Sequence, residues 1–249
     1  DYPDCLEIVE RLVKPERTRV DEHGKFALRS PLPQRWWHYA DKRPALYRTI
    51  APLERVMGIV LHSKNYIVSF TTKNGIYSHG CAVFALSENS HLSILVSSFC
   101  ELWAWKNCST IRSAGIRYTP SSAFETFPFP SGFEPDRGLG DGDADGGDTV
   151  MRERLEELGK ALDDGRREVM TRLDIGLTKL YNLYHTQELT AEAVVKAAKC
   201  PAEDAAWTVQ KIDALRALHK TIDETVRDAY GWQDIPLQHD FHELEFLPE

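Results

Sequence analysis

The spacing of apolar residues changes near residue 149, and this change limits the folds open to the chain. Beyond it, residues 149–173, 177–185, 190–199 and 203–232 carry apolar side chains at helical spacing. The last segment is the longest, and its apolar residues form one stripe: Trp207, Ile212, Leu215, Leu218, Ile222, Val226 and Tyr230. Gly231 follows at the position where a helix would end. The second half is therefore predicted to be helical.

The first half carries short strand-like runs instead. These runs are rich in Val, Ile and Phe and bounded by Pro, Gly, Asn or Ser: residues 25–29, 55–61, 65–70 and 81–86. Asn74-Gly75 predicts a tight hairpin turn, and residues 87–107 predict one core helix capped by Ser87 or Ser90. Strands followed by helices indicate the α+β class. We expect a mixed α/β domain with short strands and one core helix, then a mostly helical domain.

Composition sets the expected domain boundaries. Residues 132–149 are rich in Asp and Gly and contain too few apolar side chains to offset the entropy of ordering, so an acidic linker is predicted there. It would separate a domain over 1–131 from a helical domain over 150–249. Residues 1–20 begin as an amphipathic helix that Pro15 stops. Since the chain begins at Asp1, this helix is expected to lead in from a catalytic domain that precedes it.

Charge is divided unevenly between the two halves. Residues 1–120 hold 16 Lys and Arg against 11 Asp and Glu, a balance of +5, whereas residues 121–249 hold 14 against 27, a balance of −13. The first half is therefore expected to face an anion, although an ordinary domain beside an acidic helical one fits the same numbers. Five scattered cysteines without a C-x-x-C pair indicate a reducing cytoplasm. No apolar run reaches membrane-spanning length, so no membrane contact is expected.

No motif for an active centre is visible in the sequence. Walker A, G-x-S-x-G and the glycine-rich loop of cofactor-binding methyltransferases are all missing, so no catalytic residue is predicted and enzymatic activity of this chain alone is left open. Residues 141–152 begin like a calcium loop but end on Arg152, where a glutamate is required. His239 and His242 near the C-terminus lack the spacing of a zinc motif. No metal site is predicted.

Residues 33–50 alternate aromatic and cationic side chains. Trp36, Trp37, His38, Tyr39 and Tyr47 lie among Arg35, Lys42, Arg43 and Arg48. Such a pattern suits a phosphate backbone with bases or sugars beside it, and it equally suits a buried Trp pair with arginines reaching to solvent. Residues 61–66, 71–77 and 105–119 predict polar loops with side chains able to contact base edges and phosphates.

Four segments together carry a family resemblance: RWWHYADKRPALY, SKNYIVSF, LSILVSSFCELWAW and RYTPSSAFETFPFP. In this order and spacing they resemble the target recognition domain of large single-chain DNA adenine methyltransferases. These are the type IIG/IIL (MmeI-like) restriction-modification enzymes and the related methyltransferases of BREX and DISARM phage-defence systems. The resemblance covers about residues 30–130, and LTKLYNLYH and AYGW resemble the helical region that follows. Cys100 departs from the family pattern, in which histidine is common.

The resemblance implies a module that recognises a DNA sequence for an adenine-N6 methyltransferase using S-adenosylmethionine, which flips its target base. This chain would bind double-stranded DNA and the preceding catalytic domain, and would itself hold no cofactor. Residue type and loop position give the expected base contacts: Lys64, Lys73, Asn74, Arg112 and Arg117. The expected phosphate contacts are Arg35, Lys42, Arg43, Arg48, Arg55 and Lys106. The alternatives are a protein-interaction module of a defence complex and, less favoured, a metal-dependent hydrolase.

The stretch from Arg117 to Pro135 is expected to lead the chain away from DNA. In such a domain Phe124, Phe127 and Phe129 would fill the core, while Pro120, Pro128 and Pro130 would hold an extended path in which no helix forms. The acidic tract that follows would be repelled by phosphate.

Overall fold

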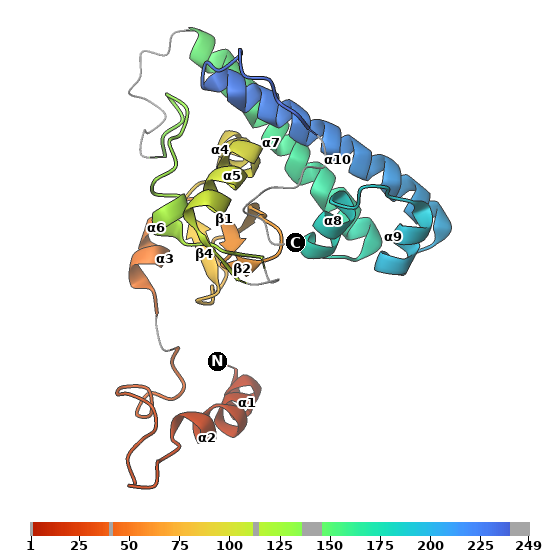
Figure 1. The fold of residues 1–249 in the computed structure, drawn as a ribbon. Coiled ribbons are helices and arrows are strands. Elements are labelled where there is room, and N and C mark those ends of the chain that lie inside the picture. Colours follow the sequence, from red (N-terminus) through yellow and green to blue (C-terminus); the bar gives the residue numbers. More distant parts are fainter. Residues whose placement is uncertain (1, 40–41, 112–114, 136–145, 240–249) are drawn as a thin grey trace. The chain divides into compact units, whose positions relative to one another are not determined.

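The computed structural model describes residues 2–39, 42–111, 115–135 and 146–239. The chain forms two compact units, Asp1–Thr49 and Ile50–Glu249. Figure 1 gives the helices and strands of each unit. The boundary between the units lies far from the expected linker at 132–149, because the hydrophobic core of the second unit contains residues from both sides of that tract.

The first unit is built from short elements and has little core. The amphipathic segment at its start forms α1 (Pro3–Leu12) and α2 (Lys14–Arg17), with Pro3 and Pro15 near the helix starts, where proline is tolerated. The predicted strand at 25–29 is reduced to one bridge between Val20 and Phe26. Among the described residues before Ile50, only Pro33 is buried. α3 (Pro44–Ile50) begins in this unit and ends at its boundary.

A three-stranded antiparallel sheet forms the centre of the second unit. Its order is β3 (Ser69–Thr72), β1 (Arg55–Val60) and β4 (Cys81–Phe84), so β1 lies between the other two. The predicted hairpin across Asn74-Gly75 is wrong, because β3 and β4 both pair with β1 and not with each other. Neither turn residue has a positive φ. The predicted strand at 65–70 is shifted, since β3 begins at Ser69.

A second small sheet lies where the sequence predicted loops. Its order is β2 (His62–Ser63), β6 (Gly115–Arg117) and β5 (Ser109–Ile111), and all pairs are antiparallel. β2 follows β1 almost directly, and the Tyr118 amide donates to the Leu61 carbonyl at 2.8 Å. These segments are therefore ordered by pairing between strands that are distant in the sequence. Their polar composition gives no indication of such pairing.

The single core helix predicted over 87–107 is two helices, α4 (Asn89–Val96) and α5 (Ser98–Asn107). Ser97 between them is extended, with ψ 153°, and its side chain caps α5 by accepting from the Cys100 amide. The Asp223 carboxylate accepts from the Ser98 amide at 2.8 Å. A second helix can start here because both caps satisfy amides that would otherwise be left unpaired.

The helical second half agrees closely with the sequence. α7 (Gly146–Leu173), α8 (Leu177–Tyr184), α9 (Ala191–Ala198) and α10 (Ala202–Ala229) match the four predicted segments. α7 packs on α4 and on α10, and Figure 1 shows the two long helices side by side. The α+β class is confirmed. The helices complete the core of the sheets instead of forming a separate domain.

The phenylalanines of the Phe-Pro stretch lie in or against the core, but its first proline starts a helix. α6 (Pro120–Ala123) contradicts the expectation of an uninterrupted extended path, because proline suits the first turn of a helix. Phe127 is 7% exposed, and Phe124 and Phe129 pack against the core. Phe133, inside the predicted linker, is 2% exposed. Among the described helices, none is long and apolar enough to cross a membrane.

Candidate functional site

The two sheets are built from segments that contain no acidic residue. Residues 55–87 and 102–124 hold Arg55, Lys64, Lys73, Lys106, Arg112 and Arg117, but neither Asp nor Glu. A chain with net charge −8 therefore keeps a purely cationic stretch on each side of α4. Such a local field attracts anions even when the whole protein is acidic.

The second sheet aligns three polar side chains on its outer surface. Arg117 pairs with His62 on one side and with Ser109 on the other, so the three residues are direct cross-strand neighbours. All three are exposed. Ile116, the next residue of β6, points to the opposite face and is 1% exposed, which anchors the strand in the core. The alternation fixes Arg117 on the solvent side.

Two lysines extend this surface. Lys64 follows β2, and Lys106 lies in the last turn of α5, three residues before Ser109; both are exposed. We refer to His62, Lys64, Lys106, Ser109 and Arg117 as the cationic sheet face. Within the described part of the chain, Lys64, Lys106 and Arg117 make no ion pair. Their charges are thus available to a ligand.

Gly115 allows the strands of this face to approach. Its φ is +100°, and a Cβ at this position would lie 2.0 Å from the Ser63 carbonyl oxygen and 2.5 Å from the Lys64 Cα. Any larger residue would displace β6 from β2. On the other side of the sheet, the Thr119 amide donates to Cys108 Sγ at 3.3 Å. These contacts hold β6, which carries Arg117, against β2 and against Lys64, which follows β2.

The other predicted contacts of this unit lie at the far end of β1. Arg55 pairs with Thr72, directly before Lys73 and Asn74, whereas β2 follows the opposite end of the strand. Five residue steps of extended chain put these ends about 16 Å apart. Arg55 donates to the Ser87 carbonyl at 3.0 Å and to Asn89 at 2.8 Å, and Lys73 donates to the Ala51 carbonyl at 2.9 Å. Asn74 is exposed.

The remaining predicted contacts lie in the first unit or outside the described residues. Arg35, Lys42 and Arg48 are exposed and Arg43 is partly exposed, with a φ of 44°. They stay predictions as phosphate contacts. Arg112 lies outside the described residues, as do residues 141–145 of the calcium-like loop and the whole tail from residue 240. In the part that is described, no group of three metal-ligating side chains comes together.

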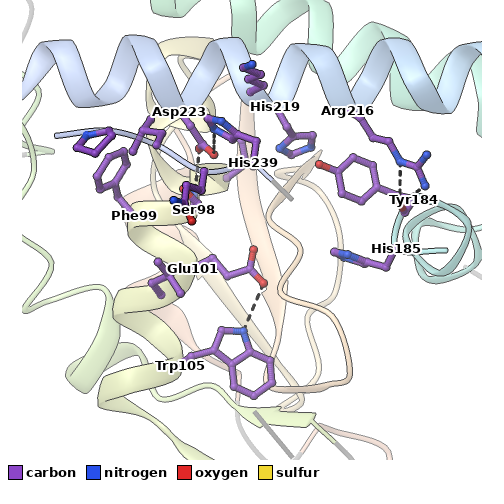
Figure 2. Close-up of a pocket in the computed structure, with 16 residues that line it drawn as sticks. Ser98, Phe99, Glu101, Trp105, Tyr184, His185, Arg216, His219, Asp223 and His239 are labelled. Carbon is purple, nitrogen blue, oxygen red and sulfur yellow. Dashed lines mark hydrogen bonds and ion pairs between the residues drawn. The ribbon is translucent and has the colours of Figure 1, made fainter. Parts of the chain in front are cut away.

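A cavity of about 530 Å³ is a second candidate site, which the sequence analysis missed. Figure 2 shows it between α5, α8, α10 and the segment Pro236–His239. Phe99, Trp105 and Tyr184 supply aromatic walls, and the polar groups Glu101, His185, Arg216, His219 and Asp223 face the space. Its size is in the range of sites that hold small molecules.

Asp223 ties three elements together at one end of the cavity. Its carboxylate accepts from the Ser98 amide of α5 and lies 3.3 Å from His239 Nε2. Burial raises the pKa of Asp223, and the bonds from Ser98 and the pairing with His239 oppose this rise without cancelling it. The ion pair holds the segment before residue 240 against the cavity.

His219 is fixed as a neutral ring by a relay of hydrogen bonds. Arg166 donates to the Tyr181 hydroxyl, and that hydroxyl lies 3.0 Å from His219 Nε2. Since arginine can only donate, the Tyr181 proton goes to Nε2, and the ring proton of His219 resides on Nδ1. Burial lowers the pKa of His219 to about 3, with the positive charge of Arg166 adding to the effect. His185 also has a lowered pKa, mainly through burial.

Glu101 is the most perturbed acid of the cavity. Burial raises the pKa of its carboxyl to about 7; the bond from Trp105 lowers it and the charge of Asp223 raises it further. Trp105 Nε1 donates to Oε1 at 3.3 Å, and Figure 2 shows the carboxyl turned into the cavity. Glu101 therefore holds a proton at pH values where an exposed glutamate is ionised.

This proton predicts a pH-dependent stability. The folded pKa of Glu101 exceeds its ordinary value of 4.5, so the folded state binds more protons than the unfolded state and stability falls as the pH rises from 4.5 to about 7. Replacing Glu101 with Gln is expected to remove this loss, which amounts to about 3 kcal/mol. Urea unfolding of both proteins at pH 4.5, 6 and 7.5 measures it; parallel curves would contradict the raised pKa.

Sequence features do mark the cavity residues in retrospect. Glu101 interrupts the apolar run FCELWAW, and His219 and Asp223 follow Leu215 at successive intervals of four along the buried stripe of α10. Charged groups at buried helical positions are rare and signal a special role.

Comparisons with protein-family models, with curated proteins and with solved structures give no match to this chain. The function has to be inferred from the residues and their arrangement.

Proposed function

We propose that this chain is a DNA-recognition module that selects the site for an adenine-specific, S-adenosylmethionine-dependent methyltransferase of a restriction-modification or phage-defence system. The methyltransferase part of this proposal rests on the sequence resemblance. The recognition part is supported by one structural observation: the cationic sheet face carries three cations without a carboxylate partner among the described residues.

The chemistry of this face suits a nucleic acid. The fork of donors on Arg117 can pair with the acceptors of a guanine edge, and Ser109 and His62 beside it can each accept or donate. Lys64 and Lys106 on the flanks can contact phosphates, which sets position but not sequence. A pair of β-strands can enter a major groove, and in this sheet β5 and β6 are paired with Arg117 on β6.

Duplex binding of the 249-residue chain tests the proposal. A fluorescent pool of random duplexes should bind, and log K should fall linearly with log salt, because phosphate contacts release counterions. Replacing Lys106 with Gln should weaken binding to every duplex and reduce the salt slope by about 1. Lys196 of α9 is an exposed cation remote in sequence from this face, and Lys196→Gln is the matched control that should change neither quantity.

Arg117 tests sequence reading separately. After selection of preferred duplexes from the pool, Arg117→Gln should cost about 1–3 kcal/mol on preferred sites and little on scrambled ones. An equal loss of binding free energy on preferred and on scrambled duplexes would show that Arg117 contacts phosphate and does not read sequence. Absence of duplex binding at any salt concentration would refute DNA recognition and favour the interaction-module alternative.

A further inference from the structure

The cavity beside α5 has the features of a ligand site in its own right. Apolar and aromatic side chains share its lining with many polar and charged ones, and its volume of about 530 Å³ would hold a bicyclic molecule. The cationic sheet face contributes none of Lys106, Ser109 or Arg117 to its lining. An inference drawn from this cavity therefore does not depend on DNA binding.

Several polar groups of the cavity remain available to a ligand. Glu101 uses one carboxyl oxygen for Trp105, and its other oxygen has no partner among the described residues. The Tyr184 hydroxyl and the His185 ring likewise form no hydrogen bond within that part of the chain. Glu101 and Tyr184 are half-buried and His185 is exposed, so each can offer its open donor or acceptor to a molecule in the cavity.

The cations around the cavity argue against a simple ammonium ligand. Arg216 donates to the carbonyls of Tyr184 and Thr186, which keeps its charge at the wall, and Lys220 lines the same space. An anionic ligand would have to approach the carboxylate of Asp223. A neutral molecule with both donors and acceptors avoids both conflicts.

We propose that the cavity binds a planar heteroaromatic amine, in which an amino group stands next to a ring nitrogen, and that Glu101 pairs with both groups. A protonated carboxyl offers an O–H donor and a carbonyl acceptor side by side, which matches this edge. Because Trp105 donates to Oε1, that oxygen is the acceptor, and Oε2 carries the proton that goes to the ring nitrogen. Oε1 has a second lone pair for the amino group.

The aromatic walls fit the flat shape of such a ligand. Phe99 and Trp105 come from α5 and Tyr184 from the end of α8, so rings border the space from two elements. Stacking on aromatic side chains is favourable for any planar heterocycle. His185 and Tyr184 can complete the hydrogen bonds of the far edge.

The pairing makes binding depend on the protonation of Glu101. Other titratable or charged groups also face the cavity: Tyr184 and His185 from α8, Arg216, His219, Lys220 and Asp223 from α10, and His239 from the terminal segment. His219, with a pKa of about 3, stays neutral between pH 6 and 8. Glu101, with a pKa of about 7, changes its state within this range.

Calorimetry with adenine tests the proposal. Adenine has the required edge and is uncharged between pH 6 and 8, purine is the same ring without the amino group, and benzylamine is a cation of similar size. Adenine should bind about ten-fold or more tightly than purine, since purine leaves an acceptor unpaired. Its affinity should fall about ten-fold from pH 6 to pH 8, as the protonated fraction of Glu101 falls.

Two variants distinguish this pairing from nonspecific stacking of a flat molecule in the cavity. Glu101→Gln keeps an acceptor and a donor side by side, so adenine should bind with an affinity that no longer changes with pH. Glu101→Leu removes both groups and should abolish binding, with unchanged circular dichroism as the check on folding. Tighter binding of benzylamine than adenine, loss of binding in Glu101→Gln, or no adenine binding to the wild-type chain would each overturn the proposal.

Discussion

Replacing Gly159 with alanine is expected to destabilise the second unit by about 3 kcal/mol or more. A Cβ at this position of α7 would lie 2.0 Å from the Asn89 carbonyl oxygen and 2.7 Å from its carbon. The obstacle is backbone, which cannot rotate away, so α7 and α4 would have to separate. Separation also disturbs Glu156, whose carboxylate accepts from the Asn89 and Ser90 amides at 3.1 and 2.7 Å.

Gly165 provides the control on the same helix. A Cβ there would meet only the end of the Leu215 side chain, at 3.1 Å, and a methyl group can move. Alanine is favoured over glycine inside a helix by about 1 kcal/mol, so Gly165→Ala should change stability by less than about 1 kcal/mol in either direction. Urea unfolding followed by circular dichroism measures both variants. Equal stability of the two would show that α4 and α7 can part without cost.

Removing the Arg166 side chain is expected to cost about 3 kcal/mol. Arg166 is 2% exposed, and its guanidinium donates to the Val68 carbonyl at 2.9 Å and to the Tyr181 hydroxyl. It thereby connects the strand side of the core with α7 and α8. Arg166→Ala leaves the Val68 carbonyl without its partner and opens a space the size of the lost side chain.

The next residue is a matched control for this change. Arg167 is exposed and pairs with Asp163 one turn earlier on the helix, at 2.6 Å. Exposed pairs of this kind contribute little, so Arg167→Ala should cost about 0.5 kcal/mol or less. Denaturant midpoints of the two variants give the comparison. If Arg166→Ala unfolds no more easily than Arg167→Ala, the buried hydrogen bonds contribute nothing to stability.

The helices of the second half could be predicted from the sequence because the spacing of apolar residues that marks a helix is a local feature. The repeats of apolar residues placed α7 to α10 within a few residues of their observed ends. The break at Ser97 was not predictable in this way. It depends partly on Asp223, which caps α5 from 125 residues further along the chain.

The sheets show the same limit. Runs rich in Val and Ile correctly located β1 and β4. The Asn74-Gly75 turn, however, predicted that β3 and β4 pair with each other, whereas both pair with β1. Of the predicted DNA contacts, Lys64, Lys106 and Arg117 come together because β2, β5 and β6 pair, while Lys73 and Asn74 lie at the other end of β1. Residue type identified the candidates, and only the strand register could group them.

The capping of α5 by Asp223 also has a consequence during synthesis of the protein on the ribosome. At about 5–20 residues per second, the chain between Ser98 and Asp223 takes roughly 6–25 s to synthesise. β5, β6 and helices α7 to α9 are all synthesised within that interval, so the capping of α5 by Asp223 and the packing of α10 are the last contacts that can form. Until α10 has left the ribosome, the start of α5 therefore lacks one of its two caps.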